Sequence, residues 1–343
     1  MAHILFADTS HPKAYDFDDL VAQAMGGTES SLLRTAQILS KQGHQVTIFQ
    51  QHRDKKSTQH NILFIGPDLL YRLQAVGYAP DHVIVLRKFP QLINFKQHFP
   101  QAQYHLWIHT YKNWEYVLKR SIRFKPAWQL ITNSKTHAKH SDRLLNKGLL
   151  GRIYNLFKPK ISIKTCYNPI PAELADYAPQ RRDTNKLLFL SAPNKGLDQV
   201  LKTFQQINRH LKDLQLYIAN PGYRNDQLTD IPNVHYLGAL PAEQVKQHIA
   251  SSLCVFYPQD TFAETFGLIY AEANALGTPV MAHDIGAARE ILHPDNALIK
   301  AGDNYQIAKM LVEWQRNLPN VSYRDEFDQP AVYQQWAKAL ELY

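Results

Sequence analysis

The chain has 343 residues, of which 45% are hydrophobic, and a formal net charge of +8. This length suits two domains of ordinary size with buried cores. No apolar run approaches the roughly 18 residues of a membrane-spanning helix, and the N-terminus has the pattern of a strand, unlike a signal peptide. The two cysteines, Cys166 and Cys254, argue against a disulfide framework. They favour a reducing cytoplasm, with both thiols buried as small side chains.

The first half begins with a strand, a loop, a helix and a second strand. His3–Ala7 predicts the first strand, residues 10–24 a polar loop, and Gln45–Phe49 the second strand. Between them, Gly26-Gly27 opens a long helical pattern. Such a unit places backbone amides at a helix N-terminus, where a phosphate can bind. The alternative interpretation of the two glycines is a tight turn.

Further apolar runs predict an open parallel sheet in this half. The expected strands are Ile62–Ile65, His82–Leu86, His105–Ile108 and Gln129–Thr132. His109 follows one of them, at the strand end where doubly wound folds place ligand contacts. A lone histidine there can equally be structural. Ser134 is expected to cap the next helix.

The positive charge concentrates in residues 112–164, which hold 13 Lys and Arg but only two acidic residues, Glu115 and Asp142. Residues 1–169 carry 23 basic and 10 acidic residues, whereas 170–343 carry 15 and 20. Aromatic residues accompany the basic segment: Trp107, Tyr111, Trp114, Tyr116, Phe124, Trp128, Tyr154 and Phe157. This composition suits single-stranded nucleic acid, anionic lipid headgroups, or an ordinary solvated helix face over a core.

The second half again alternates strands and helices. Residues 173–185 are expected to form a linker, and a turn is expected at 220–222. Lys195 precedes a helix, where its ammonium group could meet a phosphate. The expected strands are Leu187–Leu190, Leu214–Ala219, Val234–Leu237, Leu253–Phe256 and Val280–Ala282; the expected helices are Leu197–Leu211, Leu268–Leu276, Asn304–Asn317 and Gln329–Leu342.

The most informative stretch is Pro258–Leu292. It predicts a polar loop, a helix that begins at Leu268, a buried strand and a small-residue loop. The amides near the helix start and the helix dipole would point at an anion. Glu264 and Glu272 flank this site. Their carboxylates suit the vicinal diols of a sugar or a ribose, because a carboxylate accepts hydrogen bonds but repels phosphate.

The segment E-T-F-G-L-I-Y-A-E at 264–272, continued by E-A-N-A-L-G-T-P-V at 272–280, resembles the signature of the retaining glycosyltransferases of family 4. Gly-Gly-x-Glu at 26–29, Gly-His-x-Val-Thr at 43–47 and Lys-Gly-Leu at 195–197 are also similar to this family. The resemblance departs before Lys195, where the family's usual arginine is absent.

The resemblance implies a GT-B fold, α/β with two Rossmann-like domains whose parallel sheets face each other across a cleft. The expected domains are an acceptor-side domain at 1–168, a nucleotide-sugar-binding domain at 169–325, and a C-terminal helix at 326–343 that packs back on the first domain.

The resemblance also implies roles for individual residues. Glu264 would contact the donor sugar, Glu272 the ribose, and Lys195 the phosphates, while His109 would point towards the sugar. The amides that would hold the diphosphate belong to Gly27, Phe266, Gly267, Leu268 and Ile269.

The function implied is a metal-independent, retaining hexosyltransferase (EC 2.4) with no cofactor beyond its donor substrate, a UDP- or GDP-sugar. The acceptor would be a saccharide or a lipid-linked molecule in cell-surface glycan synthesis, such as lipopolysaccharide or capsule. The expected location is the cytoplasm, with an anionic membrane surface as a further partner on its inner face. The alternatives are an inverting transferase or epimerase, a non-catalytic sugar-nucleotide-binding subunit, and a nucleic-acid-binding protein that uses residues 112–164.

Overall fold

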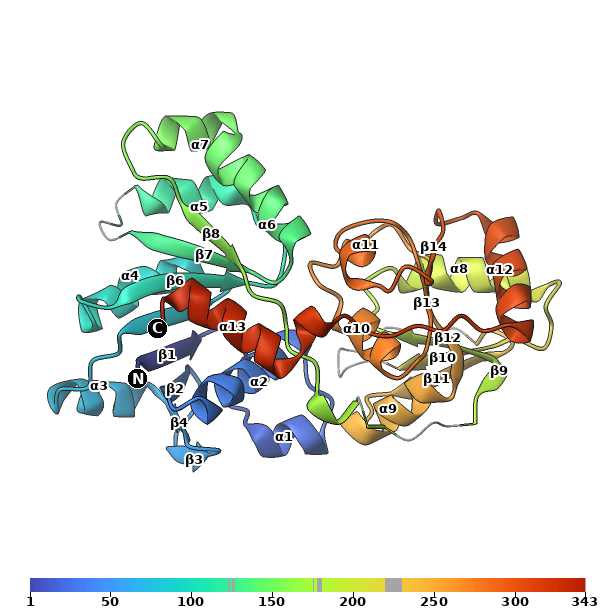
Figure 1. Ribbon diagram of the computed structural model, residues 1–343, viewed down its shortest axis with the longest axis horizontal. Coiled ribbons are helices and arrows are strands. Elements are labelled where there is room, and N and C mark those ends of the chain that lie inside the picture. Colours follow the sequence, from blue (N-terminus) through green and yellow to red (C-terminus); the bar gives the residue numbers. More distant parts are fainter. Residues whose placement is uncertain (123, 125–126, 175, 178–180, 220–229, 343) are drawn as a thin grey trace. The chain divides into compact units, whose positions relative to one another are not determined.

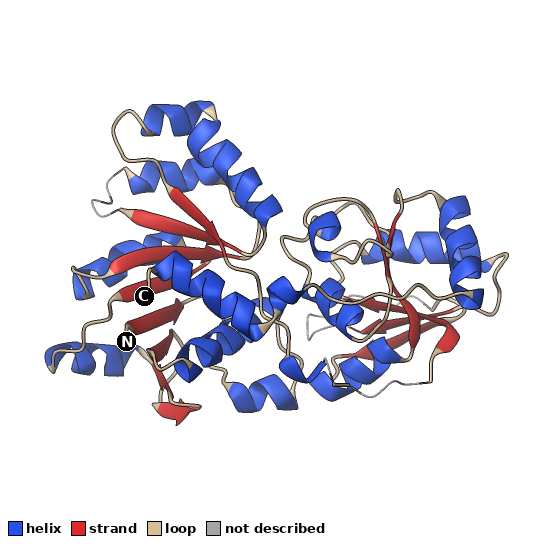
Figure 2. Ribbon diagram, viewed as in Figure 1, coloured by secondary structure: helices blue, strands red, loops and turns tan. Residues whose placement is uncertain are grey.

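The computed structural model describes residues 1–122, 124, 127–174, 176–177, 181–219 and 230–342. The chain divides into two compact units (Figure 1). Unit 1 comprises Met1–Phe17, Ser31–Pro169 and Gln329–Tyr343, and unit 2 comprises Asp18–Ser30 and Ile170–Asp328. Each unit contains one sheet surrounded by helices (Figure 2). The predicted α/β class with two parallel sheets is confirmed. The turn expected at 220–222 lies outside the described residues.

The sheet of unit 1 has the strand order β3-β4-β2-β1-β5-β6-β7-β8. All neighbouring strands are parallel except β3 and β4, which are antiparallel. The strands are β1 (His3–Asp8), β2 (Gln45–Gln50), β3 (Ser57–Gln59), β4 (Ile62–Ile65), β5 (His82–Leu86), β6 (Gln103–Ile108), β7 (Trp128–Thr132) and β8 (Ser162–Thr165). The two edge strands, β3 and β8, were not predicted, because neither has a continuous apolar run.

The helices of unit 1 follow the expected alternation. They are α2 (Gly27–Lys41, whose first turn is grouped with unit 2), α3 (Pro67–Ala75), α4 (Phe89–His98), α5 (Trp114–Ser121), α6 (Lys135–Asp142), the π-helical turn η1 (Arg143–Lys147), α7 (Leu149–Tyr154) and α13 (Gln329–Leu340). Ser134 caps α6 as predicted, since its side chain accepts a hydrogen bond from the amide of His137. The prediction of a loop over residues 10–24 was wrong in part, because the short helix α1 (Phe17–Ala22) forms there with Asp18 and Asp19 in its first turn.

The core of unit 1 contains most of the aromatic residues of the basic segment. Trp107, Trp114, Phe124, Trp128 and Tyr154 are all buried. Trp107 also packs edge-on against Trp336 of α13, with ring centroids 4.9 Å apart. The interpretation of these aromatic rings as a stacking surface for nucleic acid or lipid is therefore wrong for the buried five, which pack in the protein core.

The sheet of unit 2 has the order β11-β10-β9-β12-β13-β14, and every neighbouring pair is parallel. The strands are β9 (Asp183–Leu190), β10 (Gln215–Ala219), β11 (Val234–Gly238), β12 (Ser252–Tyr257), β13 (Val280–Ala282) and β14 (Ala297–Leu298). The α-helices are α8 (Leu197–Asn208), α9 (Ala242–Ala250), α10 (Leu268–Ala275), α11 (Ala288–Ile291) and α12 (Asn304–Arg316), and two 3-10 turns are η2 (Ala172–Leu174) and η3 (Asp325–Phe327).

The predicted linker at 173–185 was drawn too long at its C-terminal end. Strand β9 already begins at Asp183. Arg182, directly before this strand, is also held in place, because its Nη1 atom donates to the carbonyl of Ser252 at 2.7 Å. Among the described residues, no helix combines the length and the apolar character needed to cross a membrane.

Candidate functional site

The predicted anion site at the start of α10 is built on a glycine. Gly267 precedes the helix with φ +81°, and a Cβ atom added there would lie 2.5 Å from the ring of Tyr270. Among the described residues, no side chain caps this end of α10. The amide of Tyr270 donates to the carbonyl of Gly267 at 2.9 Å, whereas the first amides of a helix generally have no acceptor within it, and the positive end of the helix dipole lies at the same place. The geometry therefore suits an anionic ligand.

Glu264 lies in the loop before this helix and is buried. Its Oε1 atom accepts a hydrogen bond from Lys195 Nζ at 2.8 Å and another from the hydroxyl of Tyr257 at 3.3 Å. Lys195 Nζ also lies 4.7 Å from the centroid of the Phe262 ring. The structure thus brings together two predicted site residues, Lys195 and Glu264, that are far apart in the sequence.

A turn after β13 fixes the backbone of Glu264. The amide of Ala287 donates to the carbonyl oxygen of Glu264 at 2.9 Å. Gly286 approaches so closely, at φ +59°, that an added Cβ atom would lie 2.4 Å from the same oxygen. Gly286 is therefore required by this close approach, which fixes the backbone of Glu264 at the site.

A second contact joins the loop of Lys195 to the loop of Glu264. Gln259 bonds the backbone of Phe262 in both directions, with both distances 2.8 Å. Gly196, at φ +89°, packs against this glutamine, because an added Cβ atom would lie 2.6 Å from the Gln259 side chain. The two loops are thereby held in a fixed arrangement before any ligand arrives.

Two tyrosines that were not predicted as site residues interact electrostatically with Glu264. Burial, followed by the charge of Glu264, raises the pKa of Tyr257 far above its usual value, and the same two causes raise the pKa of Tyr270. Both hydroxyls therefore stay protonated at neutral pH, and Tyr257 is a permanent donor to Glu264. Tyr257 ends strand β12, and its position at a strand end is the signal that could have identified it.

Other predicted residues lie in the same unit. A Cβ atom added to Gly27 would lie 3.0 Å from Cδ1 of Leu268, the first residue of α10. Gly27 therefore approaches the helix start closely, as binding of a phosphate by both segments requires. Phe266 and Ile269 are buried on either side of Gly267 and Leu268. Glu272 lies in α10, half-buried, four residues after Leu268 and so on the same face of the helix.

His109 belongs to unit 1. Its two ring nitrogens are buried although the residue is partly exposed. Burial lowers the pKa of His109 well below its usual value, and the positive charges of Arg87 and Lys112 lower it further. The ring is therefore neutral at pH 7.

A group of cations near His109 was not predicted from the sequence. Arg87 directly follows β5 with φ +62°, a costly conformation for a residue with a side chain, and its Nη1 atom lies 3.4 Å from Ser10 Oγ. Burial and the charges of Arg87 and Lys88 lower the pKa of Lys112. Cations thus gather at the carboxyl ends of β1, β5 and β6. The dipeptide Arg-Lys directly after a buried strand was the available signal.

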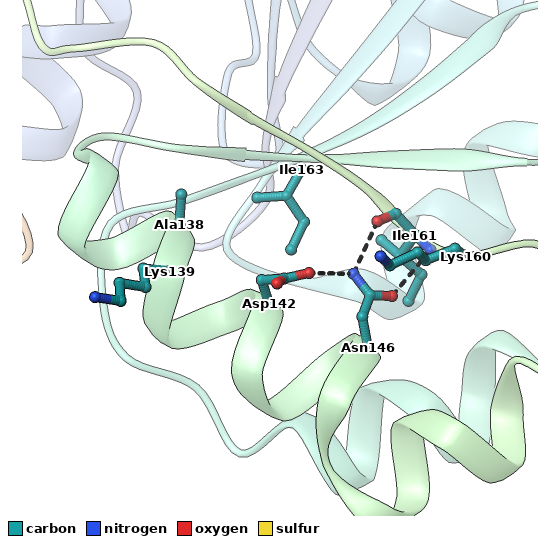
Figure 3. Close-up of a pocket in the computed structure, with 7 residues that line it drawn as sticks. All are labelled: Ala138, Lys139, Asp142, Asn146, Lys160, Ile161 and Ile163. Atoms are coloured by element: carbon teal, nitrogen blue, oxygen red, sulfur yellow. Dashed lines mark hydrogen bonds between the residues drawn. The ribbon is translucent and has the colours of Figure 1, made fainter.

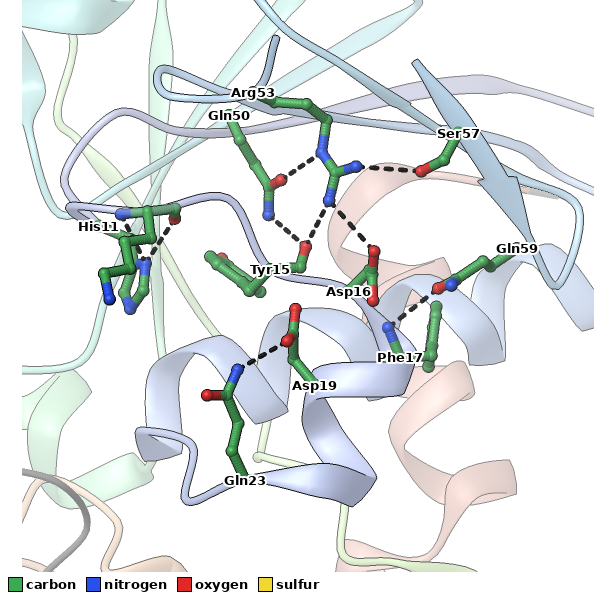
Figure 4. A network of polar contacts seen from close by, with 11 residues as sticks. His11, Tyr15, Asp16, Phe17, Asp19, Gln23, Gln50, Arg53, Ser57 and Gln59 are labelled. Carbon is green, nitrogen blue, oxygen red and sulfur yellow. Dashed lines mark hydrogen bonds and ion pairs between the residues drawn. The ribbon is translucent and has the colours of Figure 1, made fainter. Parts of the chain in front are cut away.

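A polar network stabilises the segment before α1 (Figure 4). Arg53 donates to Gln50 Oε1 at 2.7 Å and to the carbonyl of Tyr15 at 2.9 Å, and it lies 3.5 Å from Asp16. These bonds satisfy a buried guanidinium group, so this network is structural. Among the residues that the structure describes, no group of three or more His, Cys, Asp or Glu side chains is placed to hold a metal ion.

Known proteins are similar to parts of this chain in sequence and to the whole of it in fold. Residues 184–317 match the family model described as Glycosyl transferases group 1. The chain is 30% identical over 132 residues to a GDP-mannose-dependent monoacylated alpha-(1-6)-phosphatidylinositol monomannoside mannosyltransferase of Corynebacterium glutamicum; the match covers 35% of each chain. It is also 30% identical over 141 residues to a phosphatidyl-myo-inositol mannosyltransferase of Mycobacterium leprae, covering 38% of this chain and 37% of that protein.

These matches span little more than a third of the relatives' length. In contrast, the structure of HepE from Anabaena in complex with UDP-glucose covers all of both chains, with a TM-score of 0.68 and 14% sequence identity. The whole chain therefore has the GT-B fold, and its segment 184–317 is similar to group 1 glycosyl transferases.

Proposed function

We propose that this protein is a retaining glycosyltransferase that moves a hexose from a nucleoside-diphosphate sugar to a saccharide or lipid-linked acceptor. The observation that carries the proposal is the Lys195–Glu264 ion pair, because it joins a cation to a carboxylate in the same unit as the unblocked start of α10. The cation and the helix amides suit a phosphate, whereas the carboxylate suits sugar hydroxyls.

In the proposed reaction, breaking the anomeric C–O bond places negative charge on the leaving diphosphate. Lys195, the amide of Gly27 and the amides of residues 266–269 would stabilise that charge as preorganised donors. Glu264 would hold the sugar hydroxyls and Glu272 the ribose hydroxyls. The departing phosphate oxygen would accept the proton of the acceptor hydroxyl on the same face, so that no carboxylate has to act as a nucleophile and the anomeric configuration is retained.

The named relatives support this choice of substrates. Two are mannosyltransferases of phosphatidylinositol lipids, and one of those is named as GDP-mannose-dependent. The structural neighbour was solved with UDP-glucose. The cations Arg87 and Lys112 suit an acceptor that carries an anionic group, as a phospholipid does, and neutral His109 beside them could accept a hydrogen bond from its hydroxyl.

Calorimetric titration of UDP and GDP, with EDTA present, tests the donor site. We expect one nucleotide to bind the wild type without a metal ion, and Glu272→Ala to weaken that binding at least tenfold. Absence of binding by both nucleotides would refute the proposal. With the preferred donor, the anomeric configuration of the product, determined by NMR, distinguishes retention from the inversion expected of an inverting transferase.

A second candidate is a sugar-nucleotide-binding subunit without turnover. The observation in its favour is the sequence Leu190-Ser191-Ala192 before Lys195, where the family has a second cation. This candidate predicts nucleotide binding that depends on Glu272 but neither transfer nor donor hydrolysis. A transfer rate above the rate of the Lys195→Met variant would exclude it.

A further inference from the structure

Unit 1 has an exposed apolar surface on and after helix α7. Five side chains form it: Leu149, Leu150, Ile153, Leu156 and Phe157, hereafter the apolar ridge. Their exposed fractions are 76%, 46%, 47%, 78% and 77%. Isolated exposed apolar side chains are common, but five within nine residues are not, and such a patch indicates an interaction surface.

The fold fixes the outward direction of the apolar ridge. Gly151 and Tyr154 form the buried side of α7, and a Cβ atom added to Gly151 would lie 2.1 Å from the carbonyl of Leu145. Because this side packs closely on η1, the leucines at 149 and 150 and the isoleucine at 153 must point away. The turn continues the ridge, since the amide of Phe157 donates to the carbonyl of Tyr154 at 3.0 Å.

The ridge is also attached firmly to the sheet. Asn146 of η1 donates to the carbonyl of Ile161 at 3.1 Å and accepts from the amide of the same residue at 3.2 Å. Asp142 accepts a further bond from the same amide group of Asn146 at 2.8 Å. These bonds lie beside a cavity of about 370 Å³ (Figure 3). The apolar ridge is therefore a preformed surface on a rigid support.

Positive charge surrounds the ridge. Residues 143–160 contain no acidic residue. They contain five cations: Arg143, Lys147, Arg152, Lys158 and Lys160. Lys147 has an ion-pair partner in Asp142, at 2.7 Å, whereas Arg143 and Arg152 are exposed beside the apolar side chains. Helix α5 packs against α7 (Figure 1); exposed Tyr116 lies in α5, and exposed Ile122 is its C-cap residue.

We propose that the apolar ridge inserts into the surface of a membrane rich in anionic lipids, with the surrounding cations at the level of the headgroups. Exposed aliphatic side chains are stabilised when they leave water for the acyl chains of a membrane. The surrounding cations are attracted by the negative charge of anionic headgroups. Single-stranded nucleic acid would supply the negative charge, but its bases stack on exposed aromatic side chains of the protein. Here four ridge residues are aliphatic, and most aromatics of the segment are buried.

Apart from Phe157, the apolar ridge contains none of the aromatic residues that accompany the basic segment. The inference stands without the transferase proposal, because none of its residues belongs to the nucleotide site of unit 2. The two can therefore fail separately: nucleotide titration tests one, and vesicle binding tests the other.

Vesicle co-sedimentation of the full chain tests the inference. We expect binding to vesicles with 30 mol% phosphatidylglycerol in phosphatidylcholine, and no binding to phosphatidylcholine alone. The double variant Leu149→Ser/Phe157→Ser should weaken binding at least tenfold. The matched control Val76→Ser removes an equally exposed apolar side chain elsewhere in unit 1 (79% exposed) and should bind as the wild type does.

Charge variants test the second half of the proposal. Arg143→Gln/Arg152→Gln should weaken vesicle binding severalfold and reduce its dependence on salt, whereas Lys56→Gln, at an exposed lysine away from α7, should change neither. Unchanged thermal unfolding would show that each variant is folded. Wild-type-like vesicle binding by the folded ridge variant would overturn the inference. So would binding of a single-stranded oligonucleotide that requires the ridge, in the absence of vesicle binding.

Discussion

The ammonium group of Lys195 and the carboxylate of Glu264 form an ion pair with an Nζ–Oε1 distance of 2.8 Å, although 69 residues separate them. The side chain of Glu264 is 11% exposed and that of Lys195 is 30% exposed. An ammonium group has three protons, so Lys195 can keep this contact and still donate to a phosphate oxygen. The pair thus positions the cation before the donor binds.

Replacing each partner should separate their roles. Lys195→Met should weaken binding of the preferred nucleoside diphosphate about tenfold or more, about 1.4 kcal/mol, because a charged donor to the phosphates is lost. Glu264→Gln should change nucleotide affinity less than about threefold but should lower transfer from the nucleotide sugar about a hundredfold or more. Calorimetry and initial rates measure the two effects.

The exposed Lys202 on α8 supplies the control for charge, and Lys202→Met should leave both quantities unchanged. If Lys195→Met bound the nucleotide as tightly as the wild type, the proposed phosphate contact would be wrong. The double variant should lose less than the sum of the single losses, since the two residues act as one contact.

The glycine before α10 should be irreplaceable for steric reasons. In Gly267→Ala the new methyl group would lie 2.5 Å from the Tyr270 ring, at a φ of +81°. Strain and overpacking together should lower the unfolding free energy by about 2–4 kcal/mol. Gly277→Ala is the matched control, because its φ of +65° is also positive but no atom of the described residues lies within 4 Å of the added atom. It should lose only about 1–2 kcal/mol. Equal losses in urea denaturation would contradict the predicted clash.

Two adjacent arginines should differ strongly in their effect on stability. Arg182 donates to the carbonyl of Ser252 at 2.7 Å, to Thr278 Oγ1 at 2.8 Å and to the carbonyl of Gly277 at 3.1 Å. It therefore connects three segments of unit 2. Arg182→Met should lower the unfolding free energy by about 2–4 kcal/mol, because these acceptors lose a charged donor.

The neighbouring Arg181 is exposed, so Arg181→Met should change stability by less than about 0.5 kcal/mol. Thermal unfolding of the two variants side by side measures the difference. A similar melting temperature for both would mean that the three bonds of Arg182 contribute nothing net. Nothing in the sequence distinguishes these two arginines, which lie in the segment predicted as a linker.

Strand β5 shows why much of the fold could be predicted. Its sequence HVIVL has four consecutive apolar residues after His82, and all five residues are buried between neighbours on both sides. Its bounds were predicted correctly for this reason. Strand β8, SIKT, was missed because it lies at the sheet edge and three of its residues are half-buried, which leaves no apolar run to detect.

Individual residues of the candidate site could be predicted from the sequence, but the contacts between them could not. The sequence around Glu264 carries a local signature, whereas its contact with Tyr257 depends on how β12 and the following loop pack. The prediction of a binding surface made by the aromatic residues failed for a related reason. Composition places Trp114 and Trp128 in a basic segment, yet the alternation of side chains along helices and strands decides that they face the core.

Acid should destabilise unit 1 through a buried histidine. Burial, followed by the charge of His140, lowers the pKa of His137 to about 4. Its Nδ1 atom lies 3.0 Å from Asn133 Oδ1, and its ring packs against Tyr111. Above about pH 6.5 the group is neutral in both the folded and the unfolded chain. Between about 6.5 and 4 only the unfolded chain takes up the proton, so the unfolding free energy must fall as the pH decreases, by up to about 1.4 kcal/mol per pH unit.

The variant His137→Leu should remove this contribution while still filling the space. Its unfolding free energy at pH 7 will be lower than that of the wild type. Between pH 7 and pH 5, however, the decrease in unfolding free energy should be smaller than in the wild type by about 1 kcal/mol or more. Urea titrations followed by tryptophan fluorescence suit the measurement, since Trp107, Trp114, Trp128 and Trp336 all belong to unit 1. Parallel losses in the two proteins would show that His137 takes up its proton in the folded state as readily as in the unfolded chain.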